Sequence, residues 1–117
     1  MLHVPFVVHC FFRTLTGREP TRAWLRTLSK SARRIIGEDL KTAQFGWPFG
    51  MPLIRKLEPG LWEVRSRLEG GTARVIFTVE DHTMILLHGF IKQTRKTAVL
   101  DLEMARRRLA ALRGEAG

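Results

Sequence analysis

Several cationic residues in the second half of the chain stand where they could surround a phosphate. Arg65, Arg74, Lys92 and Lys96 come from three successive segments, the last of which carries the apolar run 83–87 through His-Gly-Phe into a basic stretch. Arginine binds phosphate through paired hydrogen bonds, and grouped cations stabilise the dianionic phosphorane formed when a ribose 2′-hydroxyl attacks the adjacent phosphate. The pattern therefore indicates RNA backbone cleavage that needs no metal.

Such a reaction also needs groups that accept and donate a proton. The chain has no tyrosine, which leaves Glu63, His88 or a lysine as candidates. Each has a structural interpretation as well. Arg65 and Arg74 could be solvated strand arginines paired with Glu63 across a sheet, and His88 could be a structural histidine with satisfied ring nitrogens. The residues alone leave these alternatives open.

Further residues near these cations are suited to binding RNA rather than cutting it. Arg67 and Arg95 add positive charge, and Phe90 could either stack a nucleobase or cap the core. A metal centre is not expected, because Cys10 is the only cysteine and His3, His9 and His82 lack the spacing of metal ligands. We expect no small-molecule cofactor.

The first half of the chain predicts a strand followed by a hairpin of two helices. The strand is expected over residues 3–12, and Pro20 fits the first turn of a helix whose inner face carries Trp24, Leu25 and Leu28. Ser29 or Ser31 can cap a second helix. Its inner face is predicted to carry Ile35, Ile36, Leu40 and Ala43.

The region 53–91 predicts an antiparallel β-meander, since its apolar and polar residues alternate between turn sequences. Arg65 and Arg74 then fall on the face opposite a single apolar core. A last helix is expected after Thr97 and before Gly114, with Arg106 to Arg108 facing outward. Its inner stripe is predicted to be Leu102, Ala105, Leu109 and Leu112. The aromatic residues predicted to form the core and a lid over it are Trp24, Phe45, Trp47, Phe49 and Trp62.

Together these elements predict an α+β fold in one domain spanning residues 1–117. The formal net charge is +9 and the sequence pI about 11.3, which favours nucleic acid, the ribosome or an acidic protein as partner. No apolar run approaches the roughly 20 residues of a membrane span. A signal peptide is not expected because the apolar N-terminal stretch lacks a basic start and a cleavage site, so the cytoplasm is the expected location.

The order of motifs resembles the phage-derived branch of the RelE/HigB-like toxin family, within the RelE/ParE superfamily. The resemblance rests on PLIRKLEPGLWEVRSRL, ARVIFTV, ILLHGFIKQTRKT and the tail EMARRR, and it covers most of the chain. By this resemblance the family's strand glutamate and arginine fall on Glu63 and Arg65, and the arginine of its next strand falls on Arg74. Its His-Gly-Phe motif with two following lysines falls on 88–90, Lys92 and Lys96.

The resemblance implies a toxin with a RelE-like fold that cleaves mRNA on the ribosome. The implied partner is an antitoxin with a helix-turn-helix DNA-binding domain. Two positions depart from the family motif, because Gln93 replaces a lysine and Ala98 replaces a proline. Two further hypotheses remain: a non-catalytic basic module that binds nucleic acid or an antitoxin, and a toxin directed at a topoisomerase.

Overall fold

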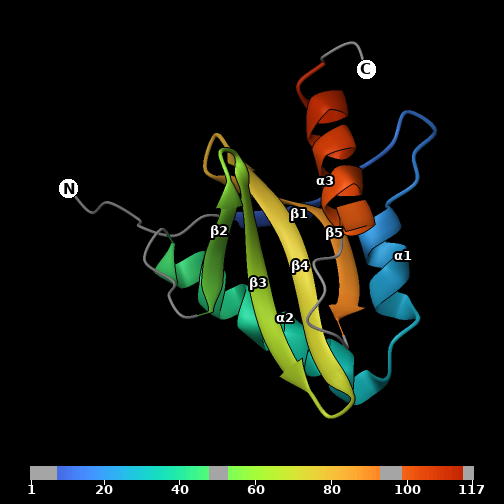
Figure 1. The fold of residues 1–117 in the computed structure, drawn as a ribbon, viewed down its shortest axis with the longest axis vertical. Helices are drawn as coiled ribbons and strands as arrows, with labels where there is room; N and C mark the ends of the chain where they lie inside the picture. Colours follow the sequence, from blue (N-terminus) through green and yellow to red (C-terminus); the bar gives the residue numbers. More distant parts are fainter. Residues whose placement is uncertain (1–7, 48–52, 93–98, 115–117) are drawn as a thin grey trace.

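The computed structural model describes residues 8–47, 53–92 and 99–114, which form a mixed five-stranded sheet with helices on both faces (Figure 1). The strands are β1 (Val8–Phe11), β2 (Ile54–Glu58), β3 (Leu61–Leu68), β4 (Gly71–Glu80) and β5 (Thr83–Lys92). Their order in the sheet is β1-β5-β4-β3-β2, with β1 parallel to β5 and the other neighbours antiparallel. The predicted α+β fold and antiparallel meander are confirmed.

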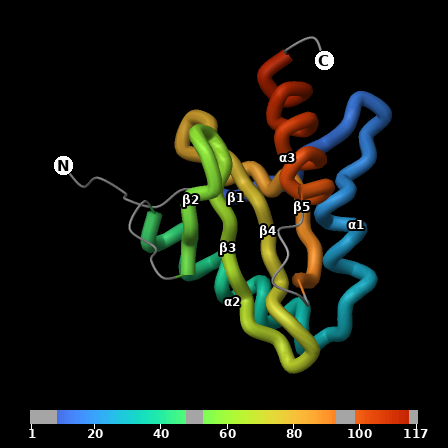
Figure 2. Tube along the Cα trace, viewed as in Figure 1, coloured from blue at the N-terminus to red at the C-terminus, as the bar shows by residue number. Residues whose placement is uncertain are grey.

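The two helices that the sequence predicts cover one face of this sheet. They are α1 (Pro20–Arg26) and α2 (Lys30–Gly46), and α2 crosses behind the strands in Figures 1 and 2. The Ser29 side chain caps α2 by accepting a 3.1 Å hydrogen bond from the amide of Ala32. The inner residues of α2 are buried against the sheet in a cluster that includes Ile36, Leu40, Val64, Val75 and Phe77.

Helix α1 packs on β5 at a position where only glycine fits. A Cβ atom built on Gly89 would lie 2.3 Å from two carbon atoms of the Trp24 ring, far inside van der Waals contact. Gly89 is itself buried. The predicted inward direction of Trp24 is therefore confirmed, and the glycine of the His-Gly-Phe motif has a packing role on this face.

The opposite face carries a second apolar cluster, which corrects the expectation of a single core. Helix α3 (Val99–Leu112) packs there, with Ala105 and Leu109 buried against sheet residues that include Leu61, Ile76 and Leu87. The predicted inner residue Leu112 is 37% exposed, because it lies in the last position of α3. The expectation that the face of Arg65 and Arg74 lies opposite the apolar core was therefore wrong for the part of this face beneath α3, which is a core of its own.

Other predictions at the margins of the elements have mixed outcomes. Phe45 is 56% exposed and does not belong to the predicted aromatic core, whereas Trp47 and Trp62 contact each other edge to face with centroids 5.0 Å apart. The N-cap predicted at Thr97, the lid residue Phe49 and the start of the first strand lie outside the described residues. Within the described ranges, no helix has the length and apolar character that crossing a membrane requires.

Candidate functional site

A register shift in β5 places the residues of the candidate site on one face. Pairing with β4 runs from Phe77 opposite Leu86 to Ile76 opposite His88, so Leu87 is an extra residue in β5. A bulge of this kind reverses the alternation of side chains between the faces. Leu87 and His88 consequently lie on the same face, and Phe90 and Lys92 follow on that face as well.

The strand register then defines rows of side chains that run across this face of the sheet. Residues directly opposite each other in antiparallel strands share a face. One row joins Arg55, Glu63, Ile76 and His88; the next joins Arg65, Arg74 and Phe90; the last joins Arg67, Thr72 and Lys92. The predicted placement of Arg65 beside Arg74 agrees with this register.

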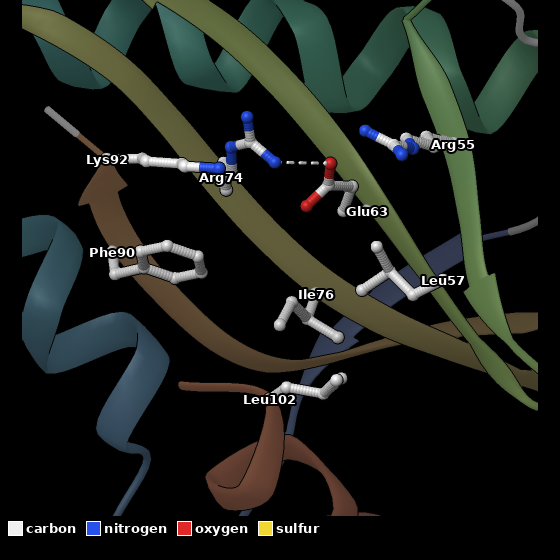
Figure 3. Close-up of a pocket in the computed structure, with 8 residues that line it drawn as sticks. All are labelled: Arg55, Leu57, Glu63, Arg74, Ile76, Phe90, Lys92 and Leu102. Carbon is white, nitrogen blue, oxygen red and sulfur yellow. Dashed lines mark hydrogen bonds and ion pairs between the residues drawn. The ribbon is translucent and has the colours of Figure 1, made fainter. Parts of the chain in front are cut away.

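A pocket of about 130 Å³ opens in these rows where α3 leaves the sheet uncovered. This is well above the roughly 10–15 Å³ that one water needs by the same measure. Figure 3 shows the eight residues that line it: Arg55, Leu57, Glu63, Arg74, Ile76, Phe90, Lys92 and Leu102. Its floor is the sheet, and Leu102 of α3 closes one side.

A buried ion pair forms the centre of the pocket. Arg74 Nη1 donates to Glu63 Oε1 over 2.9 Å, and the two side chains are 14% and 2% exposed. A buried carboxylate is stable only when it is paired, so Arg74 is needed to keep Glu63 in this position. The second carboxylate oxygen of Glu63 points into the pocket in Figure 3, where it can accept a proton or a hydrogen bond.

Two further cations flank the pair from opposite sides (Figure 3). Lys92 comes from the end of β5, and Arg55 comes from β2, where it lies opposite Glu63. Neither is paired with a carboxylate among the described residues. Three cations around one carboxylate leave the pocket with a positive excess that attracts an anionic ligand.

Sequence reasoning missed Arg55. The signal that could have found it is the alternation Ile54, Arg55, Lys56, Leu57, which becomes informative only once the register of β2 against β3 is known. The pairing of β2 with β3 also shifts register between Lys56 and Glu58, and no turn residue in the sequence marks this shift.

His88 is fixed next to the pocket and does not line it. Its Nε2 lies 2.6 Å from Asp101 Oδ1, and its Nδ1 lies 3.2 Å from Arg108 Nη1. With Asp101 accepting from Nε2, the ring takes the tautomer in which Nδ1 accepts from Arg108. The His88 ring is also stacked on Phe90 with centroids 5.7 Å apart. Both ring nitrogens are thus engaged, and the histidine holds Phe90 as a wall of the pocket.

Arg108 was predicted to face outward, and this prediction is wrong. Its Nη1 donates a 2.8 Å hydrogen bond to the carbonyl oxygen of Leu87, the extra residue of the bulge. Burial lowers the pKa of the Arg108 guanidinium, and the adjacent charge of Arg107 lowers it further. Arg108 thus links α3 to the bulge that orients the pocket strand, while Arg106 and Arg107 are exposed as expected.

The predicted four-cation basin is divided in the structure. Arg74 and Lys92 lie in the pocket, whereas Arg65 and Arg67 line a neighbouring hollow together with Leu53 and Thr72. Lys96 and Arg95 lie outside the described residues. Within the parts of the chain that the structure describes, no group of three or more histidine, cysteine or acidic residues could hold a metal ion.

The chain matches one family of known proteins. The model of the family described as phage derived protein Gp49-like matches residues 23–110, a span that begins in α1 and ends in α3. The match therefore contains every residue that lines the pocket. No curated protein matches the chain.

Proposed function

The chain belongs to the phage-derived Gp49-like family, within the RelE/ParE-like toxin superfamily, and on that premise we propose that it is the toxin of a type II toxin–antitoxin system. The proposed activity is HigB-like, ribosome-dependent cleavage of mRNA. One observation carries this proposal: an uncovered pocket joins Arg55, Arg74 and Lys92 to the single carboxylate of Glu63. Cations and one proton acceptor are the groups that cleavage next to a ribose 2′-hydroxyl requires.

The proposed reaction uses only these side chains. The 2′-oxygen forms a bond to the adjacent phosphorus while its proton passes to the free oxygen of Glu63. The bond from phosphorus to the 5′-oxygen breaks, and that oxygen takes a proton from Lys92. The products are a 2′,3′-cyclic phosphate and a 5′-hydroxyl end. Arg55 and Arg74 stabilise the negative charge that collects on the phosphorane oxygens.

The test is inducible expression of the chain, with growth and new 5′ ends within translated mRNA as readouts. Arg55→Ala is the informative variant, because Arg55 is exposed and its loss should leave the fold intact. We expect cleavage to fall by roughly 10²-fold, the usual effect of losing one group that stabilises the transition-state charge. The matched control is Arg33→Ala, an exposed arginine of α2, which should retain full activity.

Two outcomes would overturn the proposal. One is an unmodified chain that arrests growth and leaves mRNA intact; altered DNA supercoiling in that case would indicate a topoisomerase as target. The other is cleavage by Arg55→Ala at the rate of the Arg33→Ala control.

The proposed partner is an antitoxin, because toxins of this superfamily generally act with one, and we propose further that this antitoxin carries a helix-turn-helix domain. Co-expression with the product of the neighbouring gene should restore growth and yield a complex on purification. A chain that purifies alone after co-expression would contradict this partner.

A further inference from the structure

The hollow beside the pocket has the character of a second anion site. It has a volume of about 300 Å³ and is lined by Leu53, Arg65, Arg67 and Thr72, with no acidic residue among them. Arg65 and Arg67 alternate along β3, so their side chains leave the same face of the sheet about 6.7 Å apart along the strand. Two guanidinium groups therefore line the same hollow.

The two arginines lack the carboxylate partners that four exposed arginines of the described residues have. Arg13 and Arg22 pair with Glu19, Arg106 with Glu58, and Arg113 with Glu80. In the described residues, no hydrogen bond or ion pair of the Arg65 or Arg67 side chain is present. Their charge is thus available to a ligand.

The register connects the hollow to the pocket. Arg65 lies directly opposite Arg74, and Thr72 lies between Arg67 and Lys92. Neighbouring strands are about 4.8 Å apart, so the hollow is one or two side chains away from the pocket cations. This is comparable to the step between successive phosphates of an extended single strand.

We propose that Arg65, Arg67 and Thr72 bind the phosphate next to the one held in the pocket, as a second subsite for single-stranded RNA. The inference rests on the proposed function, which supplies the class of ligand. The arginines would grip the phosphate through paired charge-assisted hydrogen bonds, the Thr72 hydroxyl would donate one more, and Leu53 would contact the adjoining ribose. In this arrangement Arg65 binds the neighbouring phosphate, while Arg55, Arg74 and Lys92 act on the reacting phosphate.

The test measures binding alone. A fluorescein-labelled hexauridylate with 2′-O-methyl riboses cannot be cleaved in this way, because it has no 2′-hydroxyl. Its affinity is followed by fluorescence anisotropy as the salt concentration is raised. Losing one phosphate contact should reduce the slope of log affinity against log salt by about 0.7. We expect this loss, with roughly tenfold weaker binding, for the double variant Arg65→Ala, Arg67→Ala.

The matched control removes the same charge elsewhere. Arg33→Ala, Arg34→Ala takes two exposed arginines from α2 and should leave the slope unchanged. The variant Arg65→Lys, Arg67→Lys keeps the charge without the forked donors, so it should keep the slope while binding severalfold more weakly. It also guards against misreading a folding defect as a binding defect.

Three results would overturn the second subsite. These are an unchanged slope in Arg65→Ala, Arg67→Ala, an equal loss in the α2 control, and equally strong competition by a hexaglutamate peptide, which would indicate an acidic protein as ligand. Because the probe is not cleaved, a chain that never cuts mRNA can still pass or fail this test. The failure of one proposal is therefore distinguishable from the failure of the other.

Discussion

The two faces of the sheet are built from the same strands and have different coverings. On one face α1 and α2 lie over an apolar cluster that reaches from Ile54 to Leu86. On the other, α3 covers only a part, and beyond it the rows of side chains become cationic around Glu63. The length of α3 therefore determines which part of this face is buried as apolar core and which part stays open as the pocket.

The largest effect on stability should come from substituting Arg74, which lines the pocket and also pairs with the buried Glu63. Arg74→Ala leaves the buried carboxylate of Glu63 without its partner, which should lower the free energy of unfolding by about 3–5 kcal/mol. Urea unfolding measures it. Arg65→Ala, directly opposite on β3 but exposed, should cost less than about 0.5 kcal/mol. Equal costs would show that the uncovered face is uniform and the pair is not buried.

Replacing the buried ion pair with apolar side chains should make the pocket face resemble the covered face. Replacing the pair together, as Glu63→Leu with Arg74→Met, should recover most of the stability lost in Arg74→Ala, because two buried charges are exchanged for packed side chains. Binding of RNA should not recover. A double variant as unstable as Arg74→Ala would contradict this account.

The covered face should be sensitive to added volume. Gly89→Ala places a methyl group against the Trp24 ring and should cost about 1–3 kcal/mol in thermal or urea unfolding. Gly37→Ala is the control, since nothing lies within 4 Å of its Cβ position in α2. It should stabilise the protein by about 0.5–1 kcal/mol. The same sign for both variants would refute the tight contact between α1 and β5.

Substituting two neighbouring arginines of α3 should have different effects on stability, because one faces the sheet and the other faces solvent. Arg108→Ala loses the hydrogen bonds to Leu87 O and His88, with an expected cost of about 1–2 kcal/mol. Arg107→Ala should change stability by less than about 0.5 kcal/mol, because Arg107 is exposed. Loss of Arg108 should also weaken RNA binding modestly, since His88, which stacks on Phe90, would then be held by Asp101 alone. Identical unfolding midpoints for the two variants would argue against the linking role of Arg108.

The smallest effect concerns pH and the outer edge of α3. The hydrogen bonds from Arg106 lower the pKa of the Glu58 carboxyl below 4.5, so this pair stabilises the fold at higher pH. That contribution is lost as the pH falls through the lowered pKa. The difference in Tm between the unmodified chain and Arg106→Ala should therefore be small at pH 7 and shrink further as the Glu58 carboxyl becomes protonated in acid. A difference that grows in acid would contradict the assignment.

Much of the fold follows from local patterns in the sequence. Ser29 caps α2, the alternation of Trp62, Val64 and Leu68 with the charged residues between them gives β3, and the register of a sequential meander brings Arg65 beside Arg74. These features depend on the period of a strand or on one cap, which a single chain reveals.

The remainder depends on where elements meet. Nothing in the run of apolar residues marks Leu87 as a bulge, yet the bulge decides the face of Phe90 and Lys92. Arg108 looks like its exposed neighbours until the carbonyl of Leu87 is in place. Arg55 belongs to the site only through the register of β2. Each of these is a tertiary relation between distant segments, and helical or strand periodicity contains no information about it.

The parallel pairing of β1 with β5 has a consequence for the synthesis of this protein. Val8 pairs with Thr83, so β1 cannot join the sheet until the chain has been translated as far as β5. The pocket is completed later still, because its walls include Lys92 and Leu102. A nascent chain therefore carries no finished pocket until Leu102 has been translated.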